Sequence, residues 1–181
     1  MTVVTSTQLP VVSLPQTELL TINVESIPFV SGKLAPGVSF KPLFLEPEVG
    51  IWVIVATFEP GSGLPIHLHT GTVHAYTLSG AWGYREYPDQ LQTAGSYLYE
   101  PGASVHTLFA HESNTEDTNV LYVINGANVN FSDDGKFHSI LDAVTLMKLS
   151  REFAAESGLP VDYLTGGGAQ LNSQIAKVET D

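Results

Sequence analysis

The stretch that decides the fold is GSGLPIHLHTGTVHAYTLSG, residues 61–80. Within it His67 and His69 are separated by one residue. On a helix this spacing would point the two imidazoles about 200° apart, whereas on a strand both lie on one face. Glycine and proline precede the pair and Thr70-Gly71 follows it, which disfavours a helix. The sequence therefore predicts two neutral imidazoles on one face of a strand, which is half of a metal site.

A second stretch, GSYLYEPGASVH at residues 95–106, adds a third histidine, His106. Together the two stretches resemble the paired motifs of the cupin superfamily. The first motif reads Gly, five residues, His-x-His, three or four residues, Glu, about six residues, Gly. The second reads Gly, five residues, Pro-x-Gly-x-x-His. The resemblance covers roughly residues 45–130, and it implies an all-β fold, the cupin double-stranded β-helix or jelly-roll barrel.

The chain departs from these motifs at two positions. The glycine of the second motif falls one place early, at Gly102, and His74 stands where the first motif has glutamate. The resemblance implies that His67, His69 and His106 are metal ligands. His74 is then either a fourth ligand or a residue that orients the substrate, and both roles stay open. Because imidazole binds metal only when neutral, we expect metal affinity to fall below about pH 6.

Within the superfamily, the runs HTGTVHAYTLSGAW and YLYEPGASVHTL resemble cupins of the 2,4'-dihydroxyacetophenone dioxygenase type, which are akin to the ChrR cupins. This resemblance implies Fe(II), with zinc, nickel and manganese as alternatives. It also implies a dioxygenase that uses O2 to cleave a carbon–carbon bond of an enolisable aryl α-hydroxyketone or diketone. Two other functions fit the same histidines: a zinc-binding sensor without catalysis, and a zinc-dependent lyase or hydrolase.

Glu86 is a second candidate for a catalytic role beside His74. Alternation groups Trp82, Tyr84 and Glu86 on one face of a predicted strand. If that face is the cavity, Glu86 is a carboxylate near the metal that could bind it or take a proton from the substrate; otherwise it faces solvent beside Arg85. We expect an apolar, aromatic lining from Trp82, Tyr84, Tyr97 and Phe109, and we expect His111 and His138 to be solvated.

Composition excludes several other classes of function. The chain has 181 residues, a net charge of −12 and no cysteine. The charge disfavours nucleic acid and anionic membranes as partners, and the lack of cysteine excludes disulfides, thiolate ligands and a cysteine nucleophile. The longest apolar run, residues 50–58, is too short to span a bilayer, and the N-terminus lacks a basic signal-peptide start. We therefore expect a soluble cytoplasmic protein. The resemblance implies that it acts on a small molecule and O2.

The order of local signals predicts one cupin domain over residues 18–165. Short strands separated by turns fill it up to residue 140, and a helix is expected near 142–156, ended by Gly158 and Pro160. Residues 1–17, which carry no charge, are predicted to be an extended arm, and residues 166–181 a flexible tail. The arm and the exposed sheet edges of a jelly roll predict a homodimer or larger homo-oligomer.

Overall fold

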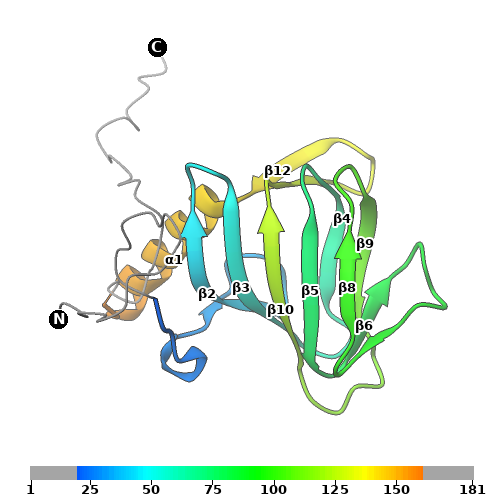
Figure 1. Cartoon of the computed structure of the whole chain (residues 1–181), viewed down its shortest axis with the longest axis horizontal. Helices are drawn as coiled ribbons and strands as arrows, with labels where there is room; N and C mark the ends of the chain where they lie inside the picture. Colours follow the sequence, from blue (N-terminus) through cyan, green and yellow to red (C-terminus); the bar gives the residue numbers. More distant parts are fainter. Residues whose placement is uncertain (1–19, 161–181) are drawn as a thin grey trace, which may run out of the picture.

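The computed structural model describes residues 20–160, which form two facing six-stranded antiparallel sheets and one C-terminal helix (Figure 1). The first sheet contains, in spatial order, β1 (Val30–Ser31), β2 (Val38–Glu46), β3 (Ile51–Phe58), β10 (Thr118–Asn125), β5 (Val73–Ser79) and β8 (Tyr97–Glu100). The second contains β12 (Phe137–Leu141), β11 (Asn128–Phe131), β4 (Gly63–His69), β9 (Val105–Ala110), β6 (Ala81–Tyr84) and β7 (Gln92–Thr93). This arrangement confirms the predicted cupin jelly roll.

Alternation of side chains builds the interior between the two sheets. Every second residue of β5 and β10 is buried, namely Val73, Ala75, Thr77, Thr118, Val120, Tyr122 and Ile124. Two buried tryptophans fill the space between the sheets, and each has a partner for its indole N–H. Trp52 donates to the Gly126 carbonyl at 2.9 Å, and Trp82 donates to the Thr77 hydroxyl at 2.8 Å. The interior is thus closely packed, and its buried indoles are satisfied.

The predicted C-terminal helix is present as α1 (Ala143–Ser157), which packs against β2, β1 and β12 (Figure 1). Asp142 caps its start by accepting a hydrogen bond from the Thr145 N–H at 2.8 Å. Gly158 ends it in the left-handed conformation, with φ 65°. Leu146 and Met147 lie on its buried face, so the helix closes one end of the barrel.

Near the two ends of the chain, the expected elements either differ from the structure or fall outside the described residues. The chain before β1 forms a short 3-10 helix, η1 (Val24–Ser26), capped by Asn23, where the sequence analysis expected only short strands and turns. The predicted arm of residues 1–17 and the predicted tail of residues 166–181 lie outside the described residues.

Two further observations concern membrane-spanning helices and the outer face of the first sheet. Within residues 20–160, no helix is both long enough and apolar enough to cross a membrane. The outer face of β5 and β8 exposes Tyr76, Leu78, Tyr97 and Tyr99. The homo-oligomer stays a prediction.

Gly80, the last glycine of the first motif, provides a test of the turn between β5 and β6. It has φ +76°, and a Cβ there would lie 2.8 Å from the Thr118 Cα. Gly135 has a similar φ of +77° but no atom within 4 Å of a Cβ. We expect Gly80→Ala to lower the free energy of unfolding by roughly 3 kcal/mol, against roughly 1 kcal/mol for Gly135→Ala. Urea denaturation measures both, and equal losses would contradict this account of the turn.

Candidate metal centre

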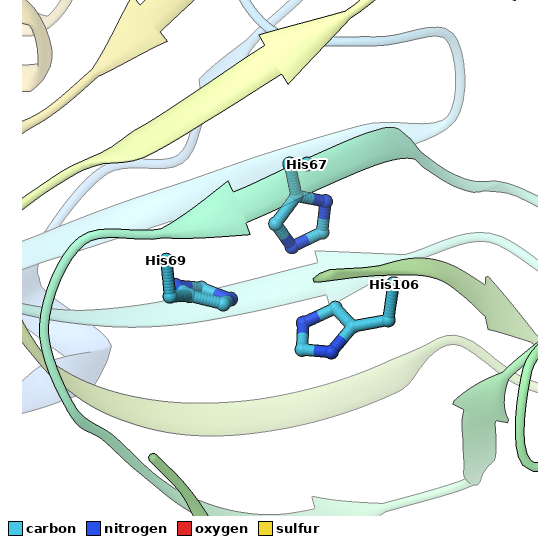
Figure 2. A group of neighbouring side chains, drawn as sticks. All are labelled: His67, His69 and His106. Atoms are coloured by element: carbon cyan, nitrogen blue, oxygen red, sulfur yellow. The ribbon is translucent and has the colours of Figure 1, made fainter. Parts of the chain in front are cut away.

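Three histidines converge from two neighbouring strands of the second sheet (Figure 2). His67 and His69 come from β4, and His106 of β9 pairs in register with His67. Each ring is at most 3% exposed, and the ring centroids lie 4.9–5.0 Å apart. One nitrogen of each ring lies within 4.8 Å of the others. The strand alternation and the register therefore bring together three imidazoles that could hold one metal ion.

Hydrogen bonds select which nitrogen of each ring can face a metal. The His67 Nδ1–H donates to the Pro65 carbonyl at 2.8 Å, which leaves the Nε2 lone pair free. Asn128 of β11 stands opposite His69 in register. The His69 Nδ1 and the Asn128 Oδ1 are buried without hydrogen-bond partners among the described residues. A hydrogen bond from the His69 Nδ1–H to the Asn128 Oδ1 would pair both atoms and would hold His69 with its Nε2 toward the cluster.

A buried glutamate that the sequence analysis did not select joins the cluster from the opposite sheet. Glu100, at the end of β8, is 4% exposed. Its Oε2 lies 3.2 Å from the His69 Nε2 and 3.1 Å from the His106 Nε2. Its Oε1 accepts a hydrogen bond from the Tyr84 hydroxyl, and the Tyr84 ring stacks on His106 with centroids 3.8 Å apart. Tyr84 thus fixes both the carboxylate and one imidazole.

Burial sets the protonation of the site. It lowers the pKa of His67 below 6.5 and that of His69 to about 4, so both rings are neutral at pH 7. Burial alone would raise the pKa of Glu100, but the contacts with His106 and His69 and the hydrogen bond from Tyr84 outweigh it and lower that pKa. The site therefore presents the neutral imidazoles of His67 and His69 and one ionised carboxylate.

This donor set fits a divalent metal ion. Glu100 Oε2 and His106 Nε2 lie 3.1 Å apart without the alignment of a hydrogen bond, and neither has a partner among the described residues. A carboxylate oxygen and an imidazole lone pair are both electron donors, and burying them together without a cation or a proton between them is costly. A metal ion would satisfy both atoms. The nitrogen and oxygen donors suit iron, zinc, nickel and manganese.

His74, which the sequence analysis considered as a fourth ligand or a substrate-orienting residue, is not brought to the cluster. It lies on the outer face of β5, because its neighbours Val73 and Ala75 are the buried residues there. Its Nδ1 forms a hydrogen bond with the Tyr97 hydroxyl at 2.7 Å, and its ring lies against Tyr99. Glu100 takes the place at the site that the sequence suggested for His74.

The structure also places Glu86 outside the interior. Glu86 is exposed and accepts hydrogen bonds from the N–H and the hydroxyl of Thr107, both at 2.9 Å. Partial burial would raise its pKa, but these bonds outweigh it and lower the pKa. Of the expected aromatic lining, Trp82 and Tyr84 are buried inside, whereas Tyr97 is 62% exposed. Phe109 alternates with buried neighbours and lies under Arg85 on the outer face.

A narrow cavity of about 30 Å³ adjoins the histidines. Its walls are mainly apolar, and the polar or ionisable residues among those that line it are His67, His69, Tyr84, Tyr122 and Asn128. Leu34, Leu64 and Leu141 line both this cavity and a larger outer groove of about 290 Å³ beside α1 and β12. These three leucines therefore lie between the cavity beside the histidines and the outer groove.

Comparison with known families agrees with this geometry. Residues 17–128 match the model of the ChrR cupin-like domain. The chain belongs to this family. No curated protein sequence matches the chain.

Solved structures share the fold of this ChrR cupin-like protein. One from Ralstonia eutropha JMP134, described as a protein of unknown function with a cupin-like fold, is 39% identical; the match covers 87% of this chain and 98% of the other, with a TM-score of 0.77. A second, described as an RmlC-like cupin protein from the same strain, is 24% identical over 82% and 95% of the two chains, with a TM-score of 0.72. An acetylacetone dioxygenase from Acinetobacter johnsonii is 15% identical over 81% and 99%, with a TM-score of 0.66.

Removing one imidazole tests the metal centre. We expect His106→Ala to lose most bound metal, because two imidazoles and a carboxylate then remain, with one side of the cluster open. Elemental analysis of the purified protein measures this loss. His138→Ala is the matched control, since His138 is exposed and bonded only to Ser139. Full metal stoichiometry in His106→Ala would contradict the assignment.

The lowered pKa of His69 makes the stability of the metal-free protein depend on pH. Between its unfolded value of 6.5 and its folded value of about 4, the unfolded chain binds a proton that the folded chain does not. Stability is therefore complete above about pH 6.5 and falls as the pH is lowered toward 4. At about 1.4 kcal/mol per pKa unit, His69 contributes up to roughly 3 kcal/mol of this loss.

Urea denaturation of the metal-free protein at several pH values measures this dependence. The slope should be smaller in His69→Gln, and it should not vanish, because the pKa of His67 is lowered as well. A stability that is flat between pH 6.5 and 4 would show that the imidazoles are not desolvated.

Proposed function

We propose that this ChrR cupin-like protein is an Fe(II)-dependent dioxygenase that cleaves a carbon–carbon bond of a compact enolisable ketone. The observation that carries the proposal is the combination of three buried imidazoles and one buried carboxylate beside an apolar cavity. His67, His69 and His106 would hold the metal, and Glu100 would lie next to it. The likeness to an acetylacetone dioxygenase shows that the two proteins share a fold and is not evidence of a shared activity.

The reaction balances without a further cofactor. When bound, the metal would act as a Lewis acid for the adjacent oxygens of the substrate and would bring O2 to it. For an α-hydroxyketone, the bond between the carbonyl and the carbinol carbon breaks, and one oxygen atom of O2 ends in each of two carboxylic acids. For a 1,3-diketone, the bond between the central carbon and one carbonyl carbon breaks, and one oxygen atom of O2 ends in a carboxylic acid and the other in a 1,2-dicarbonyl product. In both cases the substrate is oxidised while O2 is reduced.

Glu100 is the residue of this chain placed to move a proton. Forming an enolate requires a base that is ionised at neutral pH, and the lowered pKa of Glu100 meets this requirement. Its Oε1 is held by Tyr84, so only Oε2 faces the cluster. Glu100 therefore takes the base role that the sequence analysis considered for Glu86, which lies outside. The same oxygen could instead bind the metal, and the variant below separates the two roles.

The size of the cavity bears on the substrate. A cavity of about 30 Å³ holds no more than a few water molecules. An aryl ketone would require Leu34 and Leu141 to move, whereas a short aliphatic ketone needs less space. The small cavity thus supports a compact ketone, which needs a smaller displacement of these leucines than an aryl ketone.

The zinc sensor and the zinc lyase or hydrolase remain the alternative functions, since the same donors bind zinc. Metal analysis of protein purified without oxygen separates them from the dioxygenase. Predominant iron supports the proposal, and predominant zinc supports the alternatives.

Oxygen uptake by iron-loaded protein tests the activity directly. We expect uptake with acetylacetone to exceed that with 2,4'-dihydroxyacetophenone. Glu100→Gln keeps the shape of the side chain but cannot take a proton, so uptake should fall about 100-fold or more with iron retained. Lost iron in Glu100→Gln would indicate a ligand instead of a base. His74→Ala is the control and should keep both iron and uptake. No uptake with any enolisable ketone would overturn the dioxygenase.

A further inference from the structure

The polar atoms of the cavity can be assigned one by one, and a single hydroxyl is left over. His67 and His69 face the cluster, Tyr84 donates to Glu100, and Asn128 stands beside His69. The remaining polar group is the hydroxyl of Tyr122 on β10.

Tyr122 points into the barrel from the sheet opposite the histidines. It alternates with the buried Val120 and Ile124 and is 6% exposed, and its ring lies 5.8 Å from that of Trp82. Its hydroxyl is buried and has no hydrogen-bond partner among residues 20–160. Tyr122, His67 and His69 line the same cavity.

An unpaired buried hydroxyl needs an explanation, because phenylalanine would fill the same place without it. Leaving such a group unpaired destabilises the folded protein. Burial, together with the charge of Glu100, raises the pKa of Tyr122 well above its ordinary value. The hydroxyl therefore keeps its proton at neutral pH, and the cavity that Tyr122 lines is where an acceptor for it could lie.

We propose that the Tyr122 hydroxyl donates a hydrogen bond to an oxygen of the bound substrate. It would thereby select compact molecules whose oxygens lie between the histidines and β10, over apolar molecules of the same size. The identity of the substrate as an enolisable ketone rests on the proposed function; the hydrogen bond from Tyr122 requires only that an oxygen-bearing ligand enters the cavity.

Acetohydroxamate provides a probe that does not depend on turnover. Its two adjacent oxygens resemble those of an enolised α-hydroxyketone, and it binds open metal sites without reacting with O2. Calorimetry on zinc-loaded protein should show affinity about 5- to 100-fold weaker in Tyr122→Phe, the loss expected for one buried hydrogen bond. Tyr76→Phe is the matched control, because its hydroxyl is removed from the outer face of β5. It should bind like the wild type, and metal content should be equal in all three proteins.

The urea denaturation midpoint, measured without the probe, provides a second test. If the Tyr122 hydroxyl stabilises the protein itself, its removal should lower this midpoint. If the hydroxyl has no partner in the protein, Tyr122→Phe should have the same denaturation midpoint as Tyr76→Phe or a higher one. A lower midpoint would show that the hydroxyl is already paired and would overturn the proposal. Probe affinity unchanged within twofold in Tyr122→Phe, or no binding of acetohydroxamate by the wild type, would overturn it as well.

The test of Tyr122 is independent of the test of the dioxygenase activity. A protein that takes up no oxygen with any ketone loses the dioxygenase assignment. A difference in acetohydroxamate affinity between Tyr122→Phe and Tyr76→Phe would still establish Tyr122 as a ligand-binding residue.

Discussion

Three buried imidazoles and a carboxylate share the interior of a barrel whose other walls are mainly apolar, and the rest of the structure follows from keeping them there. Such groups are costly to bury unless each has a partner. The pairing of β4 with β9 sets His67 against His106, and the Pro65 carbonyl fixes the ring of His67. Tyr84 holds Glu100 from the opposite side. The facing Glu100 Oε2 and His106 Nε2 have no hydrogen-bond partner among the described residues, and a cation would bind both. The cluster is therefore best explained as a metal centre.

The two motifs of the sequence predicted the fold and much of the site, because both depend on local spacing. The His-x-His pair on a strand, the turn after it and the distance to His106 are all readable along the chain, and the structure brings the three rings together. The helix was predictable for the same reason, since Asp142 and Gly158 mark its ends.

The fourth member of the cluster could not be predicted in this way. The motif allows three or four residues before its glutamate, and a count of four selects His74, whereas a count of three selects Val73. On a strand that single residue decides between the outer and the inner face. Val73 faces inward and pairs in register with Glu100 of β8, so the carboxylate comes from the neighbouring strand. In Tyr-Leu-Tyr-Glu, residues 97–100, the alternation puts Glu100 opposite the tyrosines, but only the long-range contacts with Tyr84 and His106 show that this face is the interior.

The claim on which the account depends is that three imidazoles of this chain bind one metal ion. X-ray absorption spectroscopy at the metal edge tests it most directly, because scattering from imidazole rings reports how many of them bind the ion. The account predicts three imidazoles in wild-type protein and two in His106→Ala with any metal that it retains. A metal bound by fewer than three imidazoles in the wild type, or a spectrum unchanged in His106→Ala, would contradict it.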